Sequence, residues 1–147
     1  MAFIISQLIK KKLPEWNTRV FDADDLDRLT QSMKLPIIES ATAKAKGEYL
    51  IIEKLPVILL KPKLKSAEKL WVCYHELGHH LLHYPVSHKF SKSFQRRMDG
   101  EANFFAAVAL IPTYLVESKT LGEIMEEYNY PKELISIRKV IYENYKI

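Results

Sequence analysis

The chain has 147 residues and a mass of 17.2 kDa, which is the size of one domain. Hydrophobic residues make up 48% and charged residues 27%, so disordered, collagen-like and disulfide-rich classes are excluded. The net charge of +4 comes from a lysine-rich middle, where residues 61–100 carry 8 basic and 3 acidic groups; without an arginine cluster interleaved with aromatic residues, this indicates a solvated surface. The single cysteine, the lack of an apolar run long enough for a bilayer, and an N-terminus unlike a secretory signal predict a cytoplasmic protein.

The first predicted elements are a helix and a hairpin. Asp22 or Asp24 can cap a helix whose apolar residues recur at helical spacing before Pro36 stops it. Residues 49–52 and 57–60 are short β-rich runs separated by four residues, and they predict a β-hairpin.

Helices dominate the rest of the chain. Patterns at helical spacing predict helices over residues 66–83, 95–110, 121–128 and 132–145, with a polar loop over 86–94. We therefore predict an α+β, mostly helical fold with a small antiparallel sheet. A single domain is expected over residues 1–147, with an N-terminal extension (about 1–20) and a C-terminal pair of helices (about 119–147) in helix-turn-helix outline.

Residues 75–79 read His-Glu-Leu-Gly-His, an HExxH motif that arises by chance about once in seventy random sequences of this composition. His75 and His79 are one helical turn apart on one face, a spacing that suits two imidazole nitrogens on one zinc ion. Glu76 is displaced by about 100° around the helix axis and cannot join the same tight set of ligands. It is instead placed to act as a general base toward an attacking water.

A catalytic zinc site typically has three protein ligands, so another element must supply the third. On the next predicted helix, Asp99, Ala102, Asn103 and Ala106 share a face that is small and polar enough to approach the first helix closely. We predict Asp99 as the third ligand and Asn103 as the acceptor of a hydrogen bond from a ligand histidine. Glu101 lies on a different face and is kept as the alternative ligand.

The remaining histidines and the cysteine fit the site less well. His80 should point elsewhere, and His83 is about 12 Å from His75 along the axis, so a packing or hydrogen-bonding role is predicted for it. His88, in the predicted loop, could reach the site. Cys73 lies roughly 200° around the helix from His75 and is expected to pack in the core.

Residues 75–83, followed by residues 99–107 and Ile111-Pro112, resemble the ImmA/IrrE family of zinc metallopeptidases. The resemblance covers roughly residues 20–145 and includes the hairpin and the last two helices. It implies a zincin-like metallopeptidase fold. The family's third ligand is an acid four residues before the Asn or Asp of the second motif, which is Asp99 here where the family has Glu.

The resemblance implies an endopeptidase with one Zn²⁺ per chain, bound by His75, His79 and Asp99 with Glu76 as the base. Its expected substrate is a helix-turn-helix repressor of a mobile element or stress response, whose cleavage relieves repression. The residue that stabilises the oxyanion is left open among Tyr74, Tyr84, His88 and Tyr114. The run over residues 57–60 is a candidate strand edge that could hold an extended peptide by β-augmentation.

Two other functions compete with this interpretation. The protein could be a non-catalytic zinc-binding regulator that binds a partner, although structural zinc sites are usually closed by four protein ligands, with cysteine prominent. The C-terminal helix pair could bind DNA, but residues 101–147 carry 5 basic and 7 acidic groups, so direct nucleic-acid binding is not expected. No membrane partner is expected either.

Overall fold

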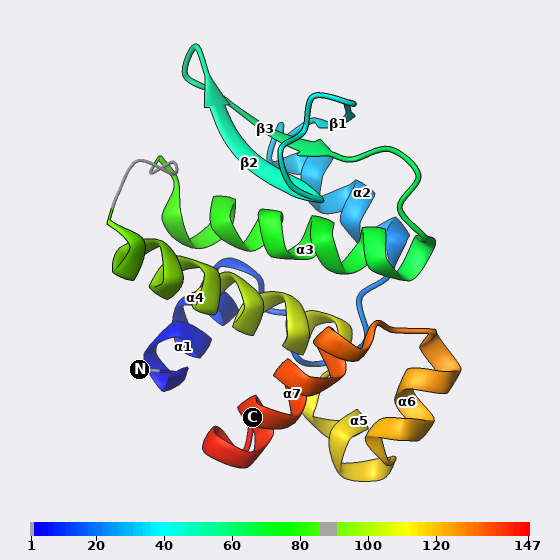
Figure 1. Cartoon of the computed structure of the whole chain (residues 1–147). Helices are drawn as coiled ribbons and strands as arrows, with labels where there is room; N and C mark the ends of the chain where they lie inside the picture. Colours follow the sequence, from blue (N-terminus) through cyan, green and yellow to red (C-terminus); the bar gives the residue numbers. More distant parts are fainter. Residues whose placement is uncertain (1, 86–90) are drawn as a thin grey trace.

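The computed structural model describes residues 2–85 and 91–147. Figure 1 shows a small sheet above α3 (Ser66–His83), with α4 (Lys92–Leu110) on the opposite side of α3 and the C-terminal helices beyond α4. The elements in chain order are α1 (Ala2–Lys12), α2 (Ala23–Ser32), β1 (Ile37–Glu39), β2 (Gly47–Ile52), β3 (Leu55–Leu60), α3 (Ser66–His83), α4 (Lys92–Leu110), α5 (Thr113–Ser118), α6 (Leu121–Tyr128) and α7 (Lys132–Tyr145).

The sheet confirms the α+β class and the predicted hairpin. β2 and β3 pair antiparallel, and Glu53 and Lys54 form the tight turn between them with φ angles of 50° and 68°. The sheet has a third strand that the sequence did not indicate, because β1 has only three residues and pairs parallel to β3. The sheet is therefore mixed, in the order β1-β3-β2.

The prediction that residues 57–60 form a sheet edge is wrong, because β3 is the central strand and is paired on both sides. The edge nearest to α3 belongs to β2, which contacts that helix. Even-numbered β3 residues bond to β1, so the β2–β3 register turns the backbone groups of Gly47, Tyr49 and Ile51 away from β3. A peptide could therefore add to the sheet only along β2 or β1.

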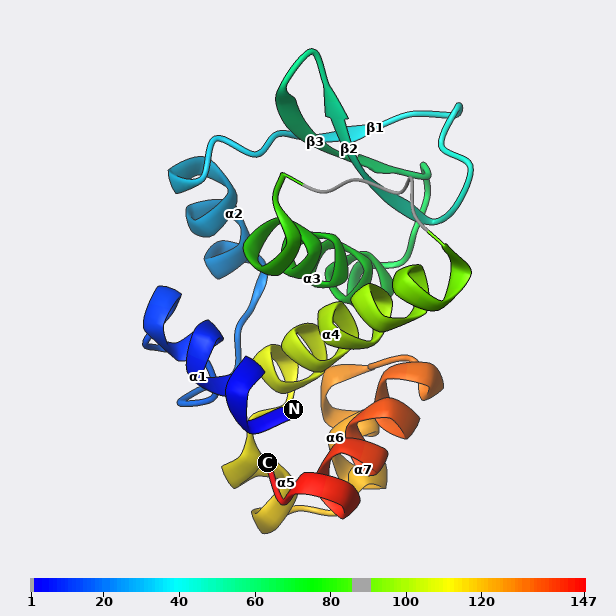
Figure 2. The same ribbon diagram turned by 90° about the vertical axis from the view of Figure 1, so that its left-hand side faces the viewer.

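Several residues of the predicted N-terminal extension contribute to the hydrophobic core. Ile9, Leu13 and Trp16 are buried, and the indole N–H of Trp16 donates to the Phe105 carbonyl of α4 at 3.0 Å. Figure 2 shows α1 beside α4, on the side away from the sheet. This arrangement fixes the face of α4 that does not meet α3.

Helix α2 begins as predicted, with Asp22 as its N-cap. The Asp22 carboxylate accepts from the Asp25 backbone N–H at 2.9 Å, and Asp25 accepts in return from the Asp22 N–H. Arg19 donates two hydrogen bonds to the Asp25 carboxylate, and this lowers the pKa of Asp25 well below its usual value. These hydrogen bonds connect the segment that precedes α2 to the first turn of that helix.

Helices α3 and α4 approach each other closely at Gly78 and Ala102. A Cβ atom built on Gly78 would lie 3.1 Å from the Ala102 Cα and 3.2 Å from its carbonyl oxygen. The same Cβ would lie 3.1 Å from Cδ2 of Phe105, and both Gly78 and Ala102 are buried, so only a residue without a side chain fits at position 78. α4 begins at Lys92, three residues earlier than predicted, and its extra turn covers part of the predicted loop.

The C-terminal helices α6 and α7 have the predicted bounds and bury Ile124, Leu134 and Ile141. Arg138 is buried as well, and its guanidinium donates to the carbonyl oxygens of Ile111 at 2.5 Å and Ile147 at 2.6 Å. One of the few cations of α7 therefore faces the interior and cannot contact DNA. Within residues 2–85 and 91–147, no helix is both long and apolar enough to span a bilayer.

Replacing Gly78 with alanine is expected to destabilise the protein by about 1–3 kcal/mol, because the added methyl group meets the backbone of α4. Gly100→Ala is the matched control. A Cβ there meets nothing within 4 Å, and alanine favours a helix by about 0.5–1 kcal/mol over glycine. Thermal unfolding of both variants checks this, and a Gly78→Ala variant as stable as the wild type would contradict the close α3–α4 contact.

Candidate metal centre

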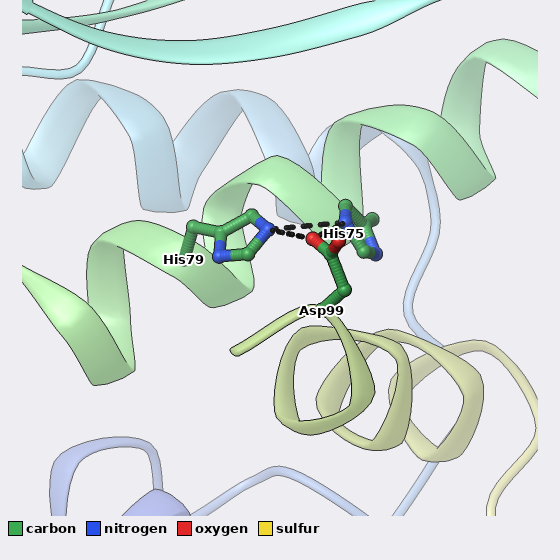
Figure 3. Close-up of side chains that lie close together, drawn as sticks. All are labelled: His75, His79 and Asp99. Carbon is green, nitrogen blue, oxygen red and sulfur yellow. Dashed lines mark hydrogen bonds and ion pairs between the residues drawn. The ribbon is translucent and has the colours of Figure 1, made fainter. Parts of the chain in front are cut away.

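Three side chains from two helices converge on one point. His75 and His79 project from α3, and Asp99 projects from α4 toward them (Figure 3). The Nε2 atom of His79 lies 3.1 Å from Nε2 of His75 and 3.0 Å from Oδ1 of Asp99, and the third separation, from His75 Nε2 to Asp99 Oδ1, is 3.5 Å. The sequence predicted these three residues as a set, and the structure brings them together.

The spacing of the three donor atoms fits a small tetrahedral ion. Ligands bound at about 2.0–2.1 Å in tetrahedral geometry are separated from each other by about 3.3 Å. The observed separations of 3.0–3.5 Å lie around that value. Two imidazoles and one carboxylate can therefore hold one cation with little movement, and a fourth position remains for water or substrate.

Each histidine of the set has a partner on its other ring nitrogen. Nδ1 of His75 is 2.7 Å from Oδ1 of Asn103, and Nδ1 of His79 is 3.1 Å from Nδ1 of His83. Asn103 thus lies where a ligand histidine needs an acceptor, as the sequence predicted. Glu101, the alternative ligand, lies 2.8 Å from Nε2 of His83 and outside the cluster of donor atoms.

Burial and charge favour the cation-binding forms of His79 and Asp99, whereas the pKa of His75 is raised, so a cation must displace a proton from His75 in part of the molecules. Burial lowers the pKa of His79 to about 3, with a further contribution from the neighbouring histidines, so its imidazole is neutral at physiological pH. Burial would also lower the pKa of His75, but the hydrogen bond to Asp99 and the nearby Glu76 carboxylate raise it overall. The hydrogen bond from His75 lowers the pKa of Asp99, which keeps the carboxylate ionised.

Glu76 is buried beside this set without belonging to it. Its Oε2 atom is 3.9 Å from Nε2 of His75. Burial raises the pKa of Glu76 to about 7, while the backbone N–H of Tyr49 bonds to the carboxylate and opposes that shift. A carboxyl group with a pKa near neutrality can both accept and return a proton, which is what a general base and acid requires.

Gly47 lets β2 lie directly against α3 at this point. A Cβ atom there would lie 2.3 Å from Cγ1 of Val72 and 3.3 Å from Cγ of Glu76. The sequence alone predicts no role for Gly47 or for the Tyr49 backbone. Their contacts with Glu76 depend on how the β2–β3 hairpin packs against α3. The one indication in the sequence is a glycine at the start of a β-rich run.

Two cavities open onto the cluster and lie on either side of it. One of about 400 Å³ extends past Trp71 and Asn103 toward Glu133. The other, of about 370 Å³, extends past Glu48 and His79 toward Gln95. Both include His75, Glu76, Asp99 and Gly47 in their walls, so both open at the start of β2 and at the loop that precedes it.

The other candidate residues lie elsewhere. The Tyr74 hydroxyl donates to the Asp22 carbonyl at 2.7 Å, and Tyr84 packs on His80, whose Nδ1 atom meets the Tyr49 hydroxyl. Tyr114 is exposed on α5, and His88 falls outside the described residues. Cys73 is buried in the core, where burial raises its thiol pKa to about 12, so it is a poor ligand.

Comparison with known proteins agrees with the geometry. The chain matches the IrrE N-terminal-like domain, the M78 family of peptidases, over residues 8–139. It is also similar to "Uncharacterized immunity region protein 2" of Bacillus phage phi105, with 31% identity over 101 residues that make up 63% of this chain and 64% of that protein. The chain thus aligns with less than two thirds of this relative. It belongs to the IrrE N-terminal-like peptidase family.

Asp99→Ala is expected to abolish metal retention, because only two imidazoles would remain on the cation. Elemental analysis of the purified protein should give about one zinc per chain for the wild type and almost none for the variant. Asp27→Ala, the same change at an exposed position of α2, is the control. A metal content unchanged in Asp99→Ala would remove Asp99 from the ligand set.

Proposed function

We propose that the protein is a zinc-dependent endopeptidase that cleaves a helix-turn-helix repressor in the cytoplasm and so relieves transcriptional repression. The observation that carries the proposal is the triangle of donor atoms from His75, His79 and Asp99 beside the buried carboxyl of Glu76. Membership of a peptidase family supports the same reaction class.

The residues divide the chemistry between them. A bound zinc ion would polarise the scissile carbonyl and lower the pKa of the attacking water. Glu76 would take the proton from that water and pass it to the leaving amine, since its buried carboxylate lies beside the donor atoms without being one of them. Tyr49 holds the Glu76 carboxylate in place through its backbone N–H.

Zinc is favoured over iron or manganese by the motif. Two histidines and one carboxylate also suit non-haem iron. An HExxH helix, in contrast, adds a carboxylate that is not a ligand but lies close enough to serve as a base, and this arrangement is typical of zinc peptidases. Glu76 has that position here, since its carboxylate is 3.9 Å from His75 Nε2.

The substrate peptide would lie along the outer edge of β2. Gly47 and Ile51 turn backbone groups toward this edge, the Tyr49 N–H between them bonds to Glu76, and both cavities open beside Gly47 at the start of the strand. An extended peptide added to the sheet here would place its backbone beside Glu76 and the donor triangle. Strand addition of this kind recognises mainly the peptide backbone, and it requires an exposed or locally unfolded segment of the target protein.

The repressor target is supported by family and context. Members of the family that the sequence resembles act on helix-turn-helix repressors, and the phage relative is named for an immunity region. A protein target that maintains repression fits both observations. Direct DNA binding by the protein's own C-terminal helices is less well supported than binding of a repressor, because Arg138 of α7 is buried.

Glu76→Gln is expected to keep its zinc and its fold but to lose cleavage by at least about 100-fold, because the amide cannot accept the proton. The assay mixes the zinc-loaded protein with helix-turn-helix repressors encoded in the same genome and follows fragments by mass spectrometry. Glu68→Gln, a change on the same helix at a residue paired with Lys46, is the control.

Cleavage retained by Glu76→Gln would rule out Glu76 as the base. If the zinc-loaded wild type bound a repressor tightly but left it intact, the non-catalytic regulator would replace the endopeptidase as the preferred function.

A further inference from the structure

A buried chain of polar contacts runs from the candidate metal centre into the protein. Nδ1 of His79 is 3.1 Å from Nδ1 of His83, and Nε2 of His83 is 2.8 Å from Oε1 of Glu101. The side chains of His83 and Glu101 are only 8% and 14% exposed. His83 is the last residue of α3, and Glu101 lies on α4 two residues after Asp99.

Metal binding by His79 Nε2 determines which ring nitrogen carries the proton in both His79 and His83. If Nε2 of His79 binds the metal, its proton must be on Nδ1, where it can be donated to Nδ1 of His83. His83 can accept only if its own proton is on Nε2, and that proton points at the Glu101 carboxylate. Each N–H donor then faces an acceptor, and this series of hydrogen bonds ends at the Glu101 carboxylate.

The two histidines of the cluster therefore have different supports. His75 is held by Asn103, a neutral amide whose Oδ1 atom is 2.7 Å away. His79 is held by a carboxylate acting through a second imidazole. An ionised acceptor makes the donating imidazole a more basic ligand than a neutral acceptor does.

We propose that His83 and Glu101 are positioning residues for the metal: together they fix the tautomer and ring orientation of His79 and strengthen it as a ligand. The proposal rests on the proposed metal site and extends it to two residues that supply no ligand atom. It also gives Glu101 a role, since this acid sits close to the ligand Asp99 in sequence yet does not contact the metal-binding atoms.

A purely structural role would look different. His83 and Glu101 also tie the end of α3 to α4, so their loss could lower stability without changing the metal site. Arg97 offers a way to separate the two roles, because its Nε atom is 3.5 Å from Oε2 of Glu101 on the exposed side of the pair, away from His83. Arg97→Gln removes that contact and leaves the chain of bonds to His79 intact.

The test measures zinc affinity by competition with a chromophoric chelator, together with thermal unfolding of the metal-free proteins. His83→Leu, which cannot accept a hydrogen bond, should weaken zinc binding by about 10–100-fold. His83→Gln, which keeps an acceptor oxygen, should recover part of this loss, and Glu101→Gln should lie between it and the wild type. Arg97→Gln should bind zinc within about twofold of wild type, because exposed ion pairs contribute little.

Wild-type protein provides a readout that needs no variant. Long-range proton–nitrogen correlation NMR of the zinc-loaded protein should show His79 protonated on Nδ1 and His83 protonated on Nε2. A His83 proton on Nδ1 would overturn the proposal, since that atom could no longer accept from His79.

The outcomes also separate this proposal from the proposed function. Zinc bound equally well by wild type and His83→Leu would overturn the role of the pair and leave the metal site standing. Reduced stability with unchanged zinc affinity would also overturn this role, and would show that His83 and Glu101 only stabilise the packing of α3 against α4. If the wild type itself bound no zinc, both this proposal and the proposed function would fall.

Discussion

The close approach of α3 and α4 at Gly78 and Ala102 is the constraint on which the site depends. His75 and His79 lie on one helix and Asp99 on the other, so the donor triangle exists only while the two helices stay in contact. Asp is a short side chain, and a wider gap between the backbones would take its carboxylate out of reach. The glycine inside the HExxH motif thus serves the geometry of the metal centre as well as helix packing.

The sheet completes the site from the opposite face of α3. Gly47 allows β2 to contact Val72 and Glu76, and the Tyr49 N–H holds the carboxylate that would act as base. The strand that positions Glu76 also begins at the two cavities, since Gly47 lies in the wall of both. The same short hairpin therefore contributes to the catalytic group and to the proposed path of the peptide.

Much of this could be predicted from the sequence, because local spacing determines local geometry. The positions of His75, His79, Asp99 and Asn103 on helix faces were enough to predict the cluster. Contacts between elements were harder: β1 is too short to show a pattern, and the pairing of β3 on both sides depends on that strand. The link between His83 and Glu101 was missed because helical spacing places His83 too far from the metal to bind it, and says nothing about a neighbour on α4.

The most direct test of this account is a crystal structure of the zinc-loaded protein with anomalous data at the zinc edge. The account predicts one strong peak per chain, bonded to Nε2 of His75, Nε2 of His79 and the Asp99 carboxylate at about 2.0–2.2 Å. A peak held instead by Glu101 or Cys73, or no peak at all in crystals grown with zinc, would contradict it.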